Sequence, residues 1–254
     1  MDLDDPHTFE LFLEVYGTLP RAGPGQDAHT MRALGLVPGR TPRTVLDGGC
    51  GPGAQTVCLA RALPETRILA VDILGEMVEE ANRRLTAEGW ADRAQAQVGD
   101  MAEPPVEPGS QDLIWCEGAI YSMGVIEALR AWRPLLRPGG TVAFTEPLWL
   151  TDAPPAEIHD WWLSEYPAMA DDREIRSEID QAGYHIVGTF ELPASAWWDE
   201  YYQPMRARLE TLRARYPGDR AAADVVRSAE IEIDMFQRFS EHYSYAFYVV
   251  QPSD

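Results

Sequence analysis

The stretch VLDGGCGPG, residues 45–53, decides the fold class of this chain. An apolar run ends in Asp47, and Gly49, Gly51 and Gly53 follow at alternate positions before a helical pattern begins. Glycines at such a place let the chain turn tightly and let a ligand lie against bare backbone. The helix that follows presents free N–H groups and the positive end of its dipole. We therefore expect a ligand-binding loop between a buried strand and a helix.

Strand and helix patterns alternate on the C-terminal side of this loop. Apolar runs typical of strands recur at residues 67–73, 94–100, 111–117 and 141–147, and amphipathic helical patterns separate most of them. Such alternation is typical of a parallel sheet with helices on both faces. In an open sheet of this kind, ligands bind outside the carboxyl ends of the strands, where the glycine loop lies.

The patterns outside this core predict a cap on a single domain, residues 1–254. Residues 41–150 form the ligand-binding core, and residues 1–40 contain two short helices joined by the Gly- and Pro-rich segment LPRAGPG. Residues 193–241 have helical spacing of apolar side chains, which indicates an inserted helical section. The aromatic run HYSYAFYVV, residues 242–250, alternates as a final strand does.

The composition excludes several classes of function. The formal net charge is −20 and the chain contains no lysine, so Schiff-base chemistry and a phosphate-binding lysine are excluded. Such acidity repels nucleic acid and anionic membranes, and no run approaches the ~18 apolar residues of a membrane span. The three cysteines lack CxxC spacing and the five histidines are dispersed, which favours a reducing compartment and predicts no metal site. We therefore expect a cytoplasmic protein without nucleic-acid or membrane partners.

Two kinds of ligand fit the glycine loop. The pattern Gly49-x-Gly51-x-x-Ala54 matches a dinucleotide fingerprint, and Asp72 follows at about the ~20-residue distance expected for a ribose contact. A nicotinamide-dependent oxidoreductase therefore stays open. Asp47, however, adds a carboxylate beside the loop, which would repel a pyrophosphate and attract an ammonium group.

The order of these motifs resembles that of the class I S-adenosylmethionine-dependent methyltransferases, over residues 44–147. The segments EGAIYSMG, LRPGGTVAFTEP and RAGPG make the chain similar to the small-molecule branch related to ubiquinone- and menaquinone-biosynthesis methyltransferases. The resemblance implies an α/β fold with a Rossmann-like, mostly parallel seven-stranded sheet whose last strand is antiparallel, helices on both faces and a helical cap.

The resemblance also implies which residues contact S-adenosyl-L-methionine. Asp72 would bind the ribose hydroxyls with Ile73 against the adenine, while Asp100 would meet the adenine amino group and Met101 would pack on the ring. The methionine part would lie near Glu117 and against the residues of the loop, which are Asp47, Gly48, Gly49, Gly51 and Gly53.

The acceptor side is expected at strand ends and in the cap. Glu146 ends a buried strand on the ligand side and is a candidate base or counter-charge for an amine. Tyr121 and His242 are the other candidate catalytic residues. The candidate substrate-binding aromatics are Tyr16, Trp149, Trp197, Tyr201 and Tyr243.

The sequence thus predicts a methyltransferase acting on a small molecule, with the methylated atom (N, O, C or S) left open. Its acidic and aromatic residues favour a cationic or a neutral aromatic acceptor. Two alternatives remain: an NAD(P)-dependent oxidoreductase, and a non-catalytic protein that keeps the cofactor-binding fold. The aromatics of the cap fit either a lid or the interface of a homodimer.

Overall fold

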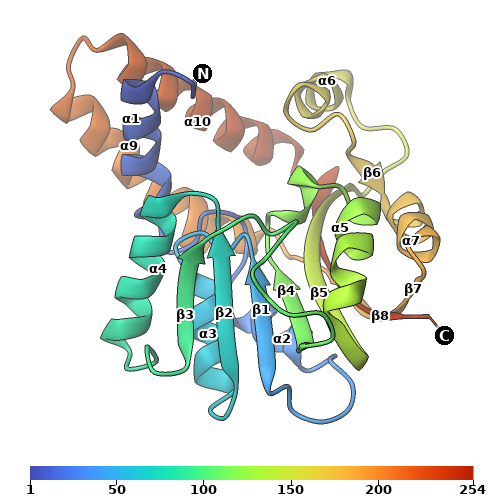
Figure 1. Ribbon diagram of the computed structural model, residues 1–254. Coiled ribbons are helices and arrows are strands. Elements are labelled where there is room, and N and C mark those ends of the chain that lie inside the picture. Colours follow the sequence, from blue (N-terminus) through green and yellow to red (C-terminus); the bar gives the residue numbers. More distant parts are fainter. Residues whose placement is uncertain (254) are drawn as a thin grey trace.

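The computed structural model of the protein describes residues 1–253 and contains a single twisted sheet. The order of its main strands is β3-β2-β1-β4-β5-β8-β7 (Figure 1). The strands are β1 (Thr44–Gly48), β2 (Arg67–Asp72), β3 (Ala94–Val98), β4 (Gln111–Cys116), β5 (Leu136–Trp149), β6 (Ala170–Asp171), β7 (Tyr184–Glu191) and β8 (Tyr243–Pro252).

The pairing confirms a mostly parallel sheet with an antiparallel last strand. Strands β1 to β5 pair in parallel, whereas β8 lies between β5 and β7 and is antiparallel to both. The two-residue strand β6 pairs with the end of β5 and is an addition to the seven expected strands. Two residues are too few to produce a periodic pattern, so the sequence could not indicate it.

Ten helices flank or cap this sheet within the described residues. Their bounds are α1 (Pro6–Tyr16), α2 (Asp27–Leu34), α3 (Ala54–Ala62), α4 (Gly75–Ala87), α5 (Val125–Trp132), α6 (Ala156–Glu165), α7 (Asp172–Gln181), α8 (Ser195–Trp197), α9 (Gln203–Arg215) and α10 (Arg220–Phe239). In Figure 1, α1, α9 and α10 form one lobe beyond the carboxyl ends of the parallel strands, and α6 forms a second lobe beside it.

Side chains alternate between the two faces of the central strands. Val45 and Leu113 belong to the hydrophobic cluster that contains residues of α2 and α3. Their neighbours Leu46 and Ile114 belong to the cluster that contains residues of α5 and α7. This period of two follows from the pleat of a strand and explains why the strands are near-continuous apolar runs: both faces are covered.

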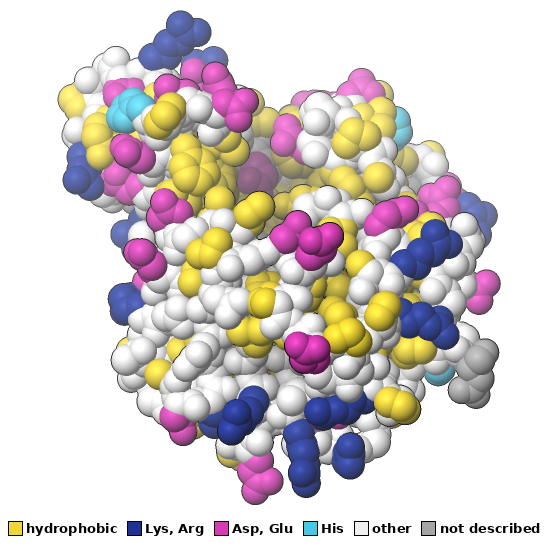
Figure 2. Space-filling model, viewed as in Figure 1, with side chains coloured by type: hydrophobic (Ala, Val, Ile, Leu, Met, Phe, Trp, Pro, Cys, Tyr) yellow, Lys and Arg dark blue, Asp and Glu magenta, His cyan; other side chains and the backbone are white. Residues whose placement is uncertain are grey.

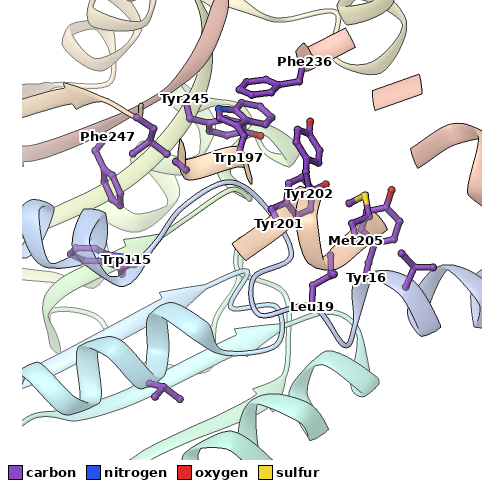
Figure 3. Close-up of a cluster of buried hydrophobic side chains, with 14 of the residues drawn as sticks. Tyr16, Leu19, Trp115, Trp197, Tyr201, Tyr202, Met205, Phe236, Tyr245 and Phe247 are labelled. Atoms are coloured by element: carbon purple, nitrogen blue, oxygen red, sulfur yellow. The ribbon is translucent and has the colours of Figure 1, made fainter. Parts of the chain in front are cut away.

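The cap shares the core of the sheet. One cluster of buried side chains runs from Trp115 and Phe247 on the sheet to Trp197, Met205 and Phe236 in the cap (Figure 3). Burial of this aromatic surface holds the cap against the carboxyl edge of the sheet, because removing apolar area from water is favourable.

The loop between α1 and α2 is fastened to the sheet layer by one arginine of α4. Arg84 donates to the carbonyl oxygens of Leu19 and Pro20, at 2.7 Å each. Its neighbour Arg83 pairs with Glu80 and is exposed. Arg84 thus positions the segment between α1 and α2.

We expect Arg84→Met to loosen this segment, because two charged donors to the carbonyl groups of Leu19 and Pro20 are lost. The free energy of unfolding should fall by about 1–3 kcal/mol, and hydrogen exchange should rise between residues 17 and 25. Arg83→Met is the matched control, since it removes a neighbouring arginine that contacts only Glu80. Equal exchange in the two variants would contradict this account of the loop.

Candidate functional site

The glycine loop after β1 needs glycine for two separate reasons. Gly49, Gly51 and Gly53 have φ values of +66°, +51° and +83°, a region that other residues avoid. A Cβ on Gly49 would also lie 2.3 Å from the Cβ of Ala119, at the end of β4. A Cβ on Gly53 would lie 2.7 Å from that of Ala81 in α4. Conformation and close packing therefore fix the path of the loop.

Asp72 at the end of β2 is held beside this loop. Its Oδ2 accepts the N–H of Gly51 at 2.8 Å, and its Oδ1 accepts the N–H of Leu74 at 3.0 Å. Each carboxylate oxygen keeps a further lone pair, because a carboxylate can accept about four hydrogen bonds. The acid is thus oriented by backbone and still able to bind a ligand hydroxyl.

A cavity of about 230 Å³ opens along the loop, and we call it the loop cavity. Gly49, Gly51, Asp72 and Glu117 line it, so the structure brings together these four predicted cofactor residues. Its remaining wall includes Phe12, Tyr16, Arg21, Leu74 and Met77. The loop cavity therefore combines bare backbone, two carboxylates and an apolar wall.

The other predicted cofactor residues lie around this cavity without lining it. Gly48 packs against Met101, since a Cβ on Gly48 would lie 3.1 Å from that of Met101. Ile73 is 73% exposed, and Asp100 is also exposed. These positions form the open side of the site, next to the end of β2.

Asp47 is placed differently from the expectation of direct contact with a ligand. It is fully buried behind the loop, where its carboxylate accepts the Thr56 hydroxyl at 2.5 Å and the Gln55 amide at 3.4 Å. Burial raises its pKa to about 7, against the opposing effect of these hydrogen bonds. In this structure Asp47 supports the start of α3 and does not face the loop cavity.

Arg21 is a site residue that the sequence interpretation did not single out. It is 4% exposed, and its guanidinium pairs with Asp27 at 2.9 Å, Glu117 at 3.0 Å and Glu200 at 3.2 Å. It belongs to the segment LPRAGPG, and nothing in its spacing indicates that Glu117 and Glu200, from distant parts of the chain, join the nearby Asp27 as its partners.

Glu117 is held by three protein donors. Besides Arg21, its carboxylate accepts the Thr30 hydroxyl at 2.7 Å and the Trp115 indole N–H at 2.8 Å. These contacts fix the carboxylate at the end of β4, as part of the wall of the loop cavity.

A second cavity, of about 630 Å³, adjoins the loop cavity, and we call it the large cavity. The two share wall residues from the α1–α2 loop and from the end of β4, among them Pro24, Gly118 and Tyr121. A volume of this size holds a drug-sized molecule. Figure 2 shows the hollow between the two lobes of the cap, with hydrophobic side chains around it.

The structure places three of the predicted acceptor-side residues on the large cavity, namely Tyr121, Trp197 and Tyr201. Tyr16 lines the loop cavity instead. The others are not among the lining residues: Tyr243 packs edge-on against Trp162 and Trp197, Trp149 stacks on His159, and His242 lies beside Phe239.

Glu146 lies directly behind the wall of the large cavity. It is 2% exposed, its Oε1 accepts the Tyr166 hydroxyl at 2.7 Å, and its Oε2 has no partner among the described residues. Burial raises its pKa to about 8, although the hydrogen bond from Tyr166 opposes this rise. Tyr166, which the sequence interpretation missed, lines the cavity and contacts the ring of Tyr121 edge-on.

Two further observations limit the kinds of site present. The described residues contain no group of three or more His, Cys, Asp or Glu side chains arranged to hold a metal ion. Among the helices of residues 1–253, none is long and apolar enough to cross a membrane.

Comparison with known proteins finds similarity to methyltransferases, most of it in the core of the chain. Residues 45–140 match the family model described as a methyltransferase domain. The chain is 26% identical to 27-O-demethylrifamycin SV methyltransferase from Amycolatopsis mediterranei, over 86% of this chain and 79% of that protein. It is 30% identical to malonyl-[acyl-carrier protein] O-methyltransferase from Legionella pneumophila, over 41% of this chain and 36% of that protein.

A solved structure extends the likeness to the whole fold. A methyltransferase from Geobacter sulfurreducens in complex with S-adenosyl-L-homocysteine superimposes with a TM-score of 0.81 at 22% identity, over 99% of this chain and 100% of that one. By sequence, this chain matches only about a third of the length of the first curated relatives.

We expect Gly49→Ala to lower the free energy of unfolding more than a glycine replacement that introduces only backbone strain. Gly39→Ala is the control, because Gly39 has a φ of +86° and open space around it. The control should cost about 1 kcal/mol, whereas Gly49→Ala must also displace the end of β4 and should cost ~2 kcal/mol more. Urea unfolding of both variants measures the difference, and equal costs would contradict the close packing of loop and strand.

The buried Glu146 should make stability fall as the pH rises. Its folded pKa of about 8 exceeds its ordinary value of 4.5, so the folded state binds more protons than the unfolded state between these values. Its contribution is thus present below pH 4.5 and is lost towards pH 8, at no more than about 1.4 kcal/mol per pH unit. Glu146→Gln should flatten this dependence in urea unfolding between pH 5.5 and 8.

Tyr166→Phe should raise the pKa of Glu146 further, because it removes the hydroxyl whose hydrogen bond lowers that pKa. Stability of this variant should fall at least as steeply with pH as that of the wild type. A Glu146→Gln variant with an unchanged pH dependence would show that Glu146 titrates like an exposed glutamate.

Proposed function

We propose that this chain, whose core is a class I methyltransferase domain, transfers a methyl group from S-adenosylmethionine to a small-molecule acceptor. The observation that carries the proposal is the junction of the loop cavity with the large cavity at Gly118 and Tyr121. A donor in the first cavity and an acceptor in the second would meet there. Methyl transfer needs little more from a protein than such alignment and the exclusion of water.

The residues of the loop cavity suit the donor chemically. The Asp72 carboxylate is oriented for a ribose diol, and glycine backbone leaves room at Gly49 and Gly51. When bound, S-adenosylmethionine supplies a methyl group on a positively charged sulfur, and the carboxylate of Glu117 lies in the same wall.

The exposed side of the site suits the adenine. Ile73 is a large apolar side chain that is 73% exposed, and an aromatic ring laid on it would remove this surface from water. We keep Met101 and Asp100 as the neighbouring contacts. In this proposal Asp47 does not contact the cofactor. It supports the loop from behind by accepting the hydroxyl of Thr56.

The dinucleotide alternative is less well supported. The doubly wound dinucleotide-binding fold has an all-parallel order of 3-2-1-4-5-6, whereas here the antiparallel β8 lies between β5 and β7. A pyrophosphate would also meet carboxylates in the loop cavity, and the guanidinium of Arg21 is already paired with three acidic residues. These features favour a ligand with a positive charge.

Tyr166 and Glu146 give the acceptor a route for its proton. Tyr166 lines the large cavity, and its hydroxyl donates to Glu146. When the acceptor carries a proton and Glu146 is ionised, that proton passes to the Tyr166 oxygen as the tyrosine proton moves to Glu146 Oε1. A pKa of about 8 makes this ionised carboxylate increasingly available as the pH rises towards 8. Tyr121 lies at the junction and orients the acceptor.

The remaining features support a reducing compartment such as the cytoplasm. The cysteines Cys50, Cys58 and Cys116 are free and buried. The net charge of −20 disfavours nucleic acid as a partner.

Asp72→Asn should weaken S-adenosylhomocysteine binding by about 10- to 100-fold, because a charge-assisted hydrogen bond to the ribose contributes about 1.5–3 kcal/mol. Isothermal titration calorimetry measures the affinity. Asp92→Asn, an exposed position outside both cavities, is the control. Unchanged affinity in Asp72→Asn would contradict the assignment of the loop cavity.

The non-catalytic alternative is tested separately. Formation of S-adenosylhomocysteine from S-adenosylmethionine in the presence of a cell extract, absent with Tyr166→Phe, would support catalysis. Donor binding without any product from such extracts would favour a protein that only binds the cofactor.

A further inference from the structure

A carboxylate on α10 that the proposed reaction does not use lines the large cavity. Glu232 accepts the hydroxyls of Tyr201 and Tyr202 on the same oxygen, Oε1, at 2.9 and 3.1 Å. Tyr16 also interacts with this carboxylate. Among the described residues, no arginine or histidine lies within ion-pair distance of Glu232, so the side chains that hydrogen-bond to it are tyrosines.

The local fold builds this arrangement from two elements. The chain forms a π-helical turn over Trp198–Tyr202, and such turns are rare in proteins and are frequently found at functional sites. This turn places the rings of Tyr201 and Tyr202 side by side, tilted by 31° with their centroids 4.9 Å apart, and both hydroxyls donate to Glu232. Figure 3 shows the two rings beside Tyr16 and Met205.

One face of α10 supplies the charged wall. Asp224, Ser228 and Glu232 recur every four residues, and Arg227 and Ile231 complete the same face of the helix. Arg227 is the one basic side chain among the residues that line the cavity. Its guanidinium therefore balances only part of the negative charge on this wall.

A further carboxylate comes from the opposite lobe. Glu165, at the end of α6, lines the large cavity and raises the pKa of Glu232 by like-charge repulsion, in addition to the larger effect of burial. Asp224, Glu165 and Glu232 thus face one cavity with a single arginine among them.

Aromatic rings form the rest of this wall. Trp161, Trp162, Trp197 and Tyr201 line the cavity together with these carboxylates. The faces of such rings attract cations, most strongly where water is excluded. Their combination with an unpaired carboxylate favours a positively charged organic group over a neutral or a negative one.

We propose that the acceptor carries an amine cation, which binds against Glu232 between the aromatic walls of the large cavity. The proposal rests on the proposed function, and it names the substrate class of that site. A half-buried carboxylate without a cationic partner is costly, and an ammonium group would supply both the missing charge and further hydrogen-bond donors. Carboxylate or phosphate groups would instead meet Glu165, Asp224 and Glu232. The cation anchors the acceptor, and the atom to be methylated lies at the junction with the loop cavity.

The experiment compares amines with their isosteres on the intact protein saturated with S-adenosylhomocysteine. The probes are benzylamine, 2-phenylethylamine and n-butylamine, each with the alcohol and the carboxylate of matching length, and calorimetry measures their affinities. We expect at least one amine to bind tenfold or more tightly than its alcohol, and no carboxylate to bind better than the amine. Equal or stronger binding of the alcohols or carboxylates, or no binding by any amine, overturns the proposal.

Glu232→Gln tests whether this residue causes the preference for amines. It removes the negative charge, while the amide oxygen can still accept both tyrosine hydroxyls. It should lower the affinity for the preferred amine about tenfold and leave the alcohol unchanged. Glu230→Gln is the matched control on the same helix: Glu230 pairs with Arg213 and does not line the large cavity. An unchanged amine preference in Glu232→Gln would also overturn the proposal.

The affinity for S-adenosylhomocysteine separates this inference from the proposed function. A wild-type protein that does not bind this product contradicts the proposed function itself. A wild-type protein that binds S-adenosylhomocysteine but does not prefer amines contradicts only the proposal of an amine acceptor. If Glu232→Gln does not fold, Glu165→Gln replaces it, since it removes an opposing carboxylate from α6 and should weaken amine binding in the same direction.

Discussion

The buried guanidinium of Arg21 is the interaction on which the arrangement of the site depends. It joins Glu117 at the end of β4, Asp27 in α2 and Glu200 in the cap, so three parts of the chain meet at one charge. A buried charge tolerates little displacement of its partners, because removing one leaves the other desolvated and unpaired. The cap is thereby held in one position over the carboxyl edge of the sheet, and apolar packing of Trp197, Met205 and Phe236 supplies the bulk of the contact.

This fixed position creates two neighbouring cavities of different character. The loop cavity is small and is shaped by backbone, with Asp72 oriented by two N–H groups. The large cavity is aromatic and acidic, and most of its wall comes from the cap. A fold of this class serves many reactions, and in the function that we propose the core binds the donor and the cap binds the acceptor. Two carboxylates with raised pKa values lie at the large cavity: the half-buried Glu232 lines it, and the buried Glu146 lies behind its wall.

Much of the fold follows from the sequence because strand and helix patterns are local. The runs at residues 67–73, 111–117 and 141–147 end at the expected edge, and the glycine loop lies where its spacing places it. Residue roles in the cap were harder to predict. Tyr166 and Glu232 belong to helical or aromatic patterns that look like ordinary packing, and Tyr243, His242 and Trp149 have the same appearance but do not line a cavity. Only contacts between distant segments distinguish the residues that line or support a cavity from those that pack elsewhere.

The sequence by itself determined the alternation of strands and helices, the glycine loop and the acid at the end of β2, since these depend on neighbours within about 30 residues. The tertiary structure decided that Arg21 meets three carboxylates, that Asp47 turns away from the loop cavity, and that Glu146 lies behind Tyr166. The physical reason is that burial and charge pairing depend on which side chains, distant in sequence, lie together in the folded chain. Glu232 lies beside Tyr201 from another segment and faces Glu165 from the opposite lobe, and its neighbours in sequence do not reveal this.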